Sequence, residues 1–320
     1  MAGNSTYPQG KADDIEKVKA YITELIDAGF DIGGKTAGWI PKGAFQRRTE
    51  SAGSVMLATV GTDGLGNYSR TTGYPTGGMS LSWEEYKLQN DRGRSFNLDG
   101  VDVMQTDALP IIDMWLGRLM NQQVIPEQDC LNVAAAYTRI KAGLAANVET
   151  YTAAGTTIIG KIAGVLDGLF DVTGIDTGYN ILVNSKYKNM ITNSTEVQKM
   201  RDVTGPVAAI ETRVGSISGS NLTWVPGKRM KTAYTKNDGL TTGQEAGGVV
   251  AATGAQDIVA IISAPNTIQA ITASQVQNIF PRGVAQGIDG SKVEMRIFYD
   301  TIISTGDLPG CYVLVEPAAP

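Results

Sequence analysis

The sequence predicts an α+β fold, and three patterns support that prediction. Apolar residues alternate with polar ones at Met79, Leu81 and Trp83, which is the period of a half-buried strand. Apolar residues then recur at helical spacing between residues 109 and 120. A second alternating stretch occupies residues 293–300. Strands therefore lie on both sides of helical segments, as in a mixed fold.

The amino-terminal stretch predicts an amphipathic helix that begins at Asp13 and Asp14 and ends at Gly29. Its apolar face is formed by four residues: Ile15, Val18, Ile22 and Leu25. A helix this short is marginal in water, so its apolar face needs a partner. The following residues 33–43, rich in glycine, predict a flexible connector.

A hairpin is expected next. Residues 54–60 predict a strand, and residues 61–66 and 74–78 predict turns. The alternating strand that begins at Met79 continues to Leu88, with a bulge expected at the adjacent Glu84 and Glu85. The charged residues 91–94 are expected to form a turn that ends this strand.

Two helical segments should follow. Thr106 is a suitable cap for a helix with Pro110 in its first turn, and the apolar positions of that helix are Leu109, Ile112, Leu116, Leu119 and Met120. After Pro126, a second helical segment contains Leu131, Ala134, Ala135 and Ile140.

The carboxyl-terminal half predicts alternating helices and strands. A helix begins near Thr156, and strands are expected at residues 180–183 and 257–263. Another helix is expected to be capped by Asn266 and stopped by Pro281. The apolar positions of that helix are Ile268, Ile271, Val276 and Ile279. Two final strands are expected at residues 293–300 and 310–315.

Three groups of residues, in this order, resemble a known family. The first group begins with the run DRGRSF at residues 91–96. Asp99, Asp102, Val103 and Thr106 follow it, and then Pro126, Glu127 and Asp129. The second is Trp224–Val225–Pro226 with residues 228–232, and the third is residues 295–300 followed by 310–313. Together they resemble the major capsid proteins of tailed bacteriophages of the Hong Kong 97 type.

This resemblance implies an organisation of the chain. It gives an amino-terminal arm (1–44), an extended loop (45–98), a peripheral domain with a spine helix (99–154), an axial domain (155–285) and return strands of the peripheral domain (286–320). It also implies self-assembly into hexamers and pentamers of an icosahedral shell around double-stranded DNA. The implied partners are a scaffolding protein, a portal and a decoration protein.

Candidate contacts between subunits follow from the same resemblance. They are the arm residues Ile15, Val18, Ile22 and Leu25, Trp83 beside the reaching loop, and the cations Arg70, Arg92, Arg94, Lys228, Arg229 and Lys231. Arginine suits such contacts because its planar guanidinium binds carboxylates with two hydrogen bonds. Some family members crosslink a lysine to an asparagine beside a glutamate, but that triad does not align with residues of this chain.

Composition agrees with a structural protein. The net charge is -5, which argues against a basic face that grips nucleic acid. The chain has no histidine, so histidine-dependent triads and the usual zinc sites are excluded. Its two cysteines exclude a disulfide framework. We therefore expect no catalytic residues, no cofactor and no metal.

The amino terminus shows neither a basic stretch nor an apolar run, and the longest aliphatic run, residues 258–262, is far shorter than the roughly 20 residues that span a bilayer. We expect synthesis in the bacterial cytoplasm, no membrane contact and a final location in the virion capsid.

One motif approaches a nucleotide-binding loop. Gly155, Gly160 and Lys161 have the spacing of a phosphate-binding loop, but Ile162 replaces the hydroxyl residue that would hold magnesium. The apolar spacing from Ile158 to Leu169 instead favours a packed helix.

Three other functions fit the sequence less well. An encapsulin-like nanocompartment shell shares the fold and holds cargo enzymes, and in it the amino-terminal helix would line a cargo groove on the lumenal side. A Gly- and Thr-rich surface protein conflicts with the absence of a signal peptide, and an enzyme conflicts with the absence of catalytic groups.

Overall fold

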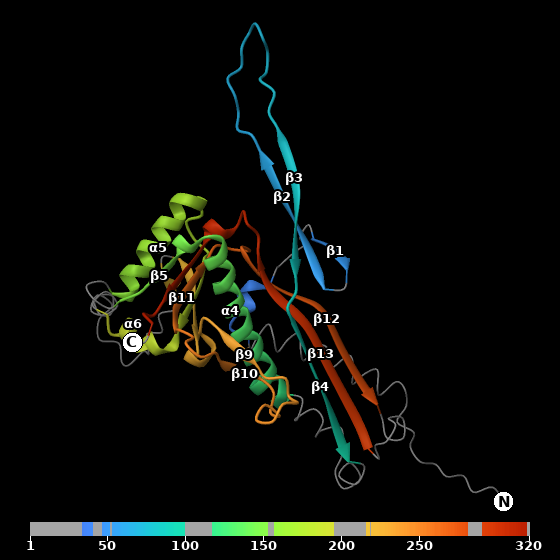
Figure 1. Cartoon of the computed structure of the whole chain (residues 1–320). Helices are drawn as coiled ribbons and strands as arrows, with labels where there is room; N and C mark the ends of the chain where they lie inside the picture. Colours follow the sequence, from blue (N-terminus) through green and yellow to red (C-terminus); the bar gives the residue numbers. More distant parts are fainter. Residues whose placement is uncertain are drawn as a thin grey trace, which may run out of the picture.

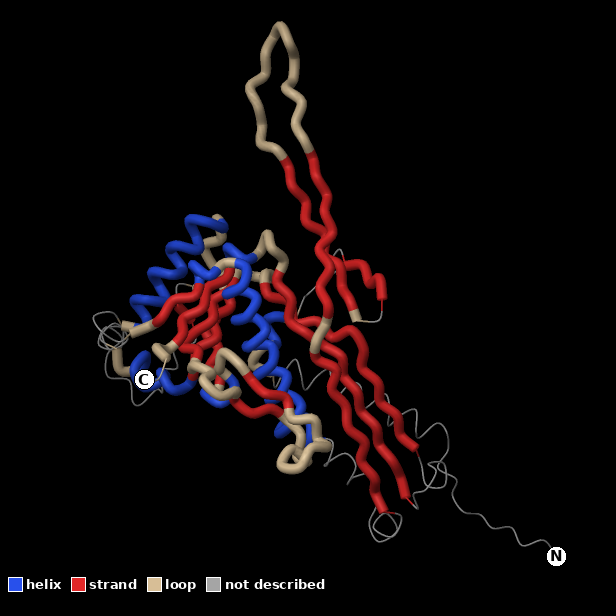
Figure 2. Tube along the Cα trace, in the orientation of Figure 1, coloured by secondary structure: helices blue, strands red, loops and turns tan. Residues whose placement is uncertain are grey.

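The computed structural model shows a body of helices and sheet from which two strand-built projections extend in opposite directions (Figure 1). The residues it describes are 34–40, 47–51, 53–99, 117–152, 157–194, 216–217, 219–280 and 290–318. Figure 2 shows that the helices gather in the body, whereas the two projections consist of strands and loops. The architecture is therefore mixed α and β, as the sequence predicts.

Four sheets hold the described strands. The body contains a six-stranded sheet, with the order β5 (Val148–Thr150), β14 (Cys311–Val315), β11 (Ile258–Ser263), β6 (Asn180–Asn184), β8 (Ser220–Val225) and β7 (Ser216–Ile217). The upper projection, which we call the hairpin, is β2 (Ser54–Thr62) and β3 (Met79–Lys87), with β1 (Arg47–Ser51) on its edge. The lower projection, which we call the blade, has the order β12 (Ile268–Phe280), β13 (Gly290–Ile303) and β4 (Asn90–Asp99). A small ribbon pairs β9 (Tyr234–Lys236) with β10 (Val249–Ala251).

The described helices lie in the body, next to its sheet (Figure 2). The longer ones are η2 (Met120–Val124), α4 (Ile125–Gly143), α5 (Ile158–Thr173) and α6 (Lys188–Thr192). Single 3-10 turns are η1 (Ala37–Trp39), η3 (Ala145–Asn147), η4 (Ser185–Tyr187), η5 (Gly227–Arg229) and η6 (Leu308–Gly310). Of these, η3 joins α4 to β5 and η4 joins β6 to α6, whereas η5 and η6 lie between strands.

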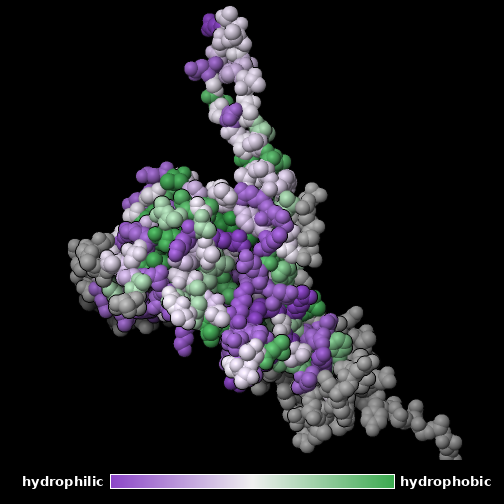
Figure 3. All heavy atoms as spheres, in the orientation of Figure 1, coloured by the Kyte–Doolittle hydropathy of each residue, from purple (hydrophilic) through white to green (hydrophobic). Residues whose placement is uncertain are grey.

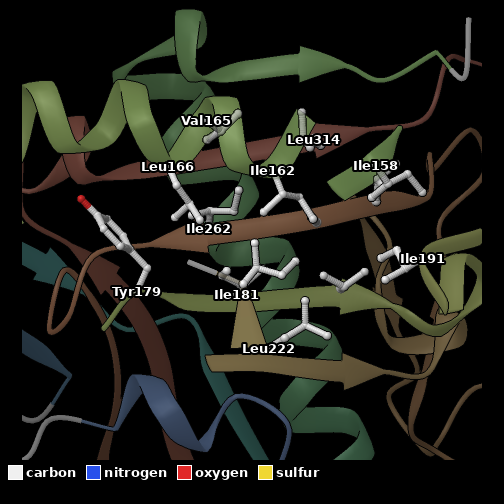
Figure 4. Close-up of a cluster of buried hydrophobic side chains, with 14 of the residues drawn as sticks. Ile158, Ile162, Val165, Leu166, Tyr179, Ile181, Ile191, Leu222, Ile262 and Leu314 are labelled. Carbon is white, nitrogen blue, oxygen red and sulfur yellow. The ribbon is translucent and has the colours of Figure 1, made fainter. Parts of the chain in front are cut away.

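The main core lies on both faces of the six-stranded sheet. On one face Ile181 and Ile262 pack against α5 (Figure 4). On the other face Leu182 and Ile261 pack in the cluster that includes Val133, Ala136 and Ile140 of α4. Every residue of β11 is buried, which explains its continuous apolar run: a strand covered on both faces has no solvent side to mark with polar residues.

Helix α5 forms as the apolar spacing predicts. Thr157 caps it, accepting a hydrogen bond from the Gly160 backbone N–H, and Gly174 ends it in the left-handed conformation (φ 68°). The predicted packing residues of its face are all buried: Ile158, Ile162, Val165, Leu166 and Leu169. The interpretation of this segment as a packed helix is confirmed.

Lys161 of α5 pairs with a carboxylate of the same chain. Its Nζ lies 2.7 Å from Glu149 Oε1. We expect ATP titrated into the parent and into Lys161→Ala to give no binding heat in either, because Ile162 cannot hold magnesium. The variant should lose about 1 kcal/mol of stability or less, as for other solvent-accessible ion pairs. Micromolar ATP binding that disappears in the variant would contradict this.

Helix α4 confirms the predicted helical segment after Pro126 but joins it to the helix before. Residues 117–119 are helical, the wider π turn η2 follows, and α4 continues without a break. Pro126 follows closely after the π turn, so the residue without a backbone N–H coincides with the irregular hydrogen bonding of this continuous helix. Thr106, Leu109, Pro110, Ile112 and Leu116 of the predicted spine helix lie outside the described residues, as do all four arm residues Ile15, Val18, Ile22 and Leu25.

The predicted helix with Asn266 as its cap is wrong, because residues 268–280 form strand β12. Asn266 lies in the left-handed region (φ 62°), in the turn before the strand. Residues three apart lie on one face of a helix, and this spacing suggested a helix. In a strand, residues three apart lie on opposite faces, and at the start of β12 both faces are covered by other parts of the chain. Ile268 packs with α4, whereas Ile271 packs at the base of the hairpin. Their β-branched side chains also favour a strand.

Two expectations about the hairpin are corrected. Residues 91–94 do not form a turn: they belong to β4, which pairs with β13 along its whole length. Gly93 is needed there because a Cβ would lie 2.8 Å from the Met295 carbonyl oxygen. The bulge expected at Glu84 and Glu85 is absent, since β2 and β3 pair in unbroken register.

One further expectation changes. The connector predicted to be flexible contains η1, in which Trp39 is 2% exposed and packs with α4. Strand β14, which the resemblance assigns to the return strands of the peripheral domain, lies in the body sheet between β5 and β11, and the domain assignment itself stays a prediction. The expected strands at 54–60, 180–183, 257–263, 293–300 and 310–315 are all confirmed.

Candidate assembly surface

The hairpin extends beyond the body (Figure 1), and the side chains on its two faces differ chemically. Directly paired residues of antiparallel strands lie on one face, so the register of β2 and β3 assigns every side chain. One face carries the pairs Ala58 with Trp83, Val60 with Leu81, and Thr62 with Met79. We call this the apolar face. The other, the polar face, carries Thr59 with Ser82 and Gly61 with Ser80.

The apolar face is left uncovered by the described residues of its own chain. Met79 is 83% exposed, Leu81 59%, Val60 57% and Trp83 42%. Figure 3 shows hydrophobic residues on the lower part of the projection. A contiguous group of large, exposed apolar side chains marks an interaction surface, because binding a partner removes these side chains from water.

The tip of the hairpin is ordered by its own contacts. Asp63 accepts a hydrogen bond from the Gly78 N–H at 2.6 Å, and the backbones of Ser69 and Gly73 bond to each other. The rings of Tyr68 and Tyr74 lie 4.9 Å apart. Arg70, a predicted interface residue, is exposed at this tip. The tip can therefore present a shaped surface to a partner.

Arg92 and Arg94 bind partners in their own chain. Arg92 Nε lies 2.5 Å from Glu127 Oε1, and its other nitrogens donate to the carbonyls of Asn237 and Gly248. Arg94 donates to the carbonyls of Glu245 and Ala246 at 2.6 and 2.8 Å. Each guanidinium thus fastens the loop between β9 and β10 to the blade. Their predicted role between subunits stays a prediction, and these intrachain contacts need no neighbour.

Two of the cations after Trp224, Arg229 and Lys231, pair with carboxylates of their own chain. Arg229 lies 3.0 Å from the buried Asp129, and Lys231 lies 2.6 Å from Asp257. The backbone carbonyl of Lys228 accepts a hydrogen bond from the Tyr234 hydroxyl at 2.8 Å. Contacts of these three residues with another subunit remain a prediction.

Sequence reasoning missed the network around Asp129. This carboxylate, fully buried, accepts hydrogen bonds from the backbone N–H groups of Lys35 and Thr36 and from the Thr36 hydroxyl, at 3.0 to 3.1 Å. Asn132 donates to the same hydroxyl and accepts from Thr301. Asp129 thus joins the segment before η1, helix α4 and the Arg229 loop. The one signal in the sequence was a carboxylate in the apolar helix segment after Pro126.

Electrostatic contacts stabilise the blade as well. Arg296 forms a two-pronged contact with Asp91 at 2.8 and 2.5 Å, and this contact lowers the pKa of Asp91. Burial raises the pKa of Asp300, although Arg139 lies 3.1 Å away and opposes that shift. The first contact joins β13 to β4, and the second joins α4 to β13.

The described part of the chain contains no group of three or more His, Cys, Asp and Glu side chains placed to hold a metal ion. In the same residues, no helix has the length and apolar character needed to cross a membrane.

No family model and no curated protein matches the chain. Solved structures do match it, among them the capsid of cyanophage P-SCSP1u, at 12% identity and a TM-score of 0.58 over 91% of this chain and 94% of the other. The mature capsid of bacteriophage PhiM1 matches at 13% identity and a TM-score of 0.58, over 85% and 84%. A structure from Mycobacterium phage Bobi matches at 10% identity and a TM-score of 0.51, over 90% and 91%.

These similarities extend over most of each chain and lie in the fold, since so few residues are identical. The body, the blade and the projecting hairpin are all present in one chain (Figure 1). The chain has the Hong Kong 97-type fold of phage capsid proteins.

Proposed function

We propose that this chain is the major capsid protein of a tailed bacteriophage, which self-assembles into the hexamers and pentamers of an icosahedral shell around double-stranded DNA. The observation that carries the proposal is the apolar face of the hairpin. Val60, Met79, Leu81 and Trp83 project from the body on a capsid fold, and the described residues of the chain leave them in water. A second copy of the chain is the occupant that this fold supports.

The mechanism is geometric and requires no enzymatic turnover. The hairpin of one subunit lies over its neighbour and buries the apolar face. One such contact is modest, but each subunit in a closed shell is held by several neighbours at once. Repeated contacts of this kind become effectively irreversible through their high local concentration.

Other parts of the proposal rest on the family resemblance. The arm residues Ile15, Val18, Ile22 and Leu25 dock on a neighbouring subunit or on a scaffolding protein. A portal and a decoration protein complete the shell, and the subunits are made in the cytoplasm of the host bacterium. The division into arm (1–44), extended loop (45–98), peripheral domain (99–154 and 286–320) and axial domain (155–285) belongs to this proposal, with β14 placed in the body sheet.

The direct test is assembly of the purified chain. We expect electron microscopy and light scattering to show closed shells, capsomers or tubes over a range of protein and salt concentrations, with or without a scaffold. A monodisperse monomer under all of these conditions would contradict the proposal. Particles purified from an infected host should contain DNA. Particles that contain an enzyme cargo and lack a portal would instead identify a nanocompartment.

A further inference from the structure

The hairpin is joined to the rest of the chain by a small apolar cluster. Val55 and Leu57 of β2 and Leu88 pack against Ile271 of β12 and Ile302 of β13. This cluster reaches no further along β2 than Leu57. Beyond it, within the described part of the chain, the side-chain hydrogen bonds of residues 58–83 stay inside the hairpin. An apolar contact is non-directional, so this cluster alone does not determine the angle of the hairpin.

Glu84 supplies a directional contact immediately above the cluster. Its Oε2 accepts hydrogen bonds from the Thr305 N–H at 3.2 Å and from the Thr305 hydroxyl at 3.1 Å, and it also accepts from the Tyr86 hydroxyl. Thr305 lies in the turn after β13, where the Asp307 N–H donates to the Ser304 carbonyl at 3.0 Å. The carboxylate therefore connects the hairpin to a well-defined corner of the body.

We propose that the Glu84 carboxylate is a pin that fixes the direction of the hairpin, and that loss of its negative charge frees the hairpin to swing about the apolar cluster. The inference deepens the proposed function, because the direction of the hairpin decides where its apolar face meets a second subunit. Hydrogen bonds to a charged acceptor are stronger than those to a neutral one, so the charge itself matters.

The charged and titratable side chains near Glu84 come from its own strand, from helix α4, from strand β13 and from the turn after β13. Tyr86 lies on the same strand, with the Arg139 guanidinium of α4 5.5 Å from its ring, and Arg139 is paired with Asp300 of β13. Asp307 lies in the turn that follows β13. Burial raises the pKa of Asp307 and the Glu84 charge raises it further, so these two carboxylates repel each other. Burial raises the pKa of Tyr86 to about 12, with Glu84 adding to the shift, so Tyr86 stays a neutral donor.

The direction of the pH effect follows from Glu84. Burial raises its pKa, but the hydrogen bonds from Tyr86 and Thr305 outweigh burial and lower the pKa below the ordinary 4.5. A lowered pKa means that the folded contact favours the charged form. The contact is therefore fully formed above the ordinary value and is lost as the pH falls through the lowered pKa. Protonation of Asp307 only removes a repulsion, so release requires protonation of Glu84 itself.

The test measures the spread of distances between the hairpin and the body. Spin labels are attached to Ser80→Cys on the hairpin and to Asp167→Cys on α5, two exposed positions, while both native cysteines are buried. Labelled chain is diluted with excess unlabelled chain so that only intrachain distances count. At about pH 7 we expect a single narrow distance distribution in the parent. In Glu84→Ala and Glu84→Gln we expect a broad distribution instead. Lowering the pH well below 4.5, through the lowered pKa of Glu84, should broaden the distribution in the parent and leave Glu84→Gln unchanged.

The matched control is Glu85→Gln, which removes the neighbouring charge on the opposite face of β3 and should keep the narrow distribution. Circular dichroism checks that each variant is folded. If Glu84→Ala kept the narrow distribution, Glu84 would not fix the direction of the hairpin. If acid broadened the distribution of Glu84→Gln as much as that of the parent, the pH dependence would not come from Glu84. Because the distances are intrachain, these results do not depend on whether shells form, so failure of the pin and failure of the proposed function are distinguishable.

Discussion

Replacing Leu81 and Trp83 together with aspartate should abolish shell formation while the chain stays folded. Both side chains are exposed in the free chain, so charge there costs little before assembly. In the proposed contact they are buried, and each contributes at most about 1.5 to 3 kcal/mol through removal of its remaining exposed apolar surface from water. An aspartate buried without a partner costs several kcal/mol more. The loss recurs at every subunit contact, so electron microscopy and sedimentation should show no closed particles.

The polar face of the same hairpin supplies the matched control. Ser80→Asp with Ser82→Asp introduces the same two charges on the same strand, pointing to the opposite side. We expect this variant to assemble like the parent, with circular dichroism unchanged in both double variants. Normal shells from the Leu81 and Trp83 variant would show that the apolar face is not the contact. Equal loss in the two variants would mean that charge on the hairpin, rather than its apolar face, controls assembly.

Asp129→Ala should strongly destabilise the folded chain. The substitution leaves the backbone N–H groups of Lys35 and Thr36 without their acceptor, and it leaves Arg229 without its carboxylate. Breaking a buried pair by removing one partner costs about 3 to 5 kcal/mol. We expect a loss of this size in the free energy of unfolding, measured by denaturant titration of the soluble chain.

Asp167→Ala is the control for that measurement. Asp167 is exposed on α5, and surface substitutions of this kind change stability by about 0.5 kcal/mol or less. Asn132→Ala removes the neighbouring amide, which joins Thr36 to Thr301, and should give an intermediate loss. A loss for Asp129→Ala as small as that for Asp167→Ala would show that the network does not hold the segment before η1 to α4.

Elements with one strong local pattern could be predicted from the sequence. Helix α5 has an apolar stripe, a threonine cap and a glycine end, and all three agree. Strand β11 is a continuous run of apolar residues, which is typical of a strand buried on both faces. The alternation of Met79, Leu81 and Trp83 likewise predicted a strand, and the exposure of these residues is consistent with the reaching loop that the family resemblance implied.

Elements whose local patterns were ambiguous were predicted wrongly. The spacing of three in Ile268 and Ile271 fits one face of a helix or two faces of a strand, and only the presence of cover on both faces decides between them. The charged residues 91–94 look like a turn in isolation. They form a strand because their backbone pairs with β13, far away in the sequence, and Arg92 and Arg94 find acceptors in the loop between β9 and β10.

The sequence by itself determined the mixed fold class, the family resemblance and the position of the hairpin, because each depends on local patterns and on their order along the chain. The tertiary structure alone decided which face of the hairpin is free, which residues hold its base, and where Arg92, Arg94, Arg229 and Lys231 find their partners. Those features depend on contacts between distant segments, and the geometry of such contacts is set only when the sheets and helices pack.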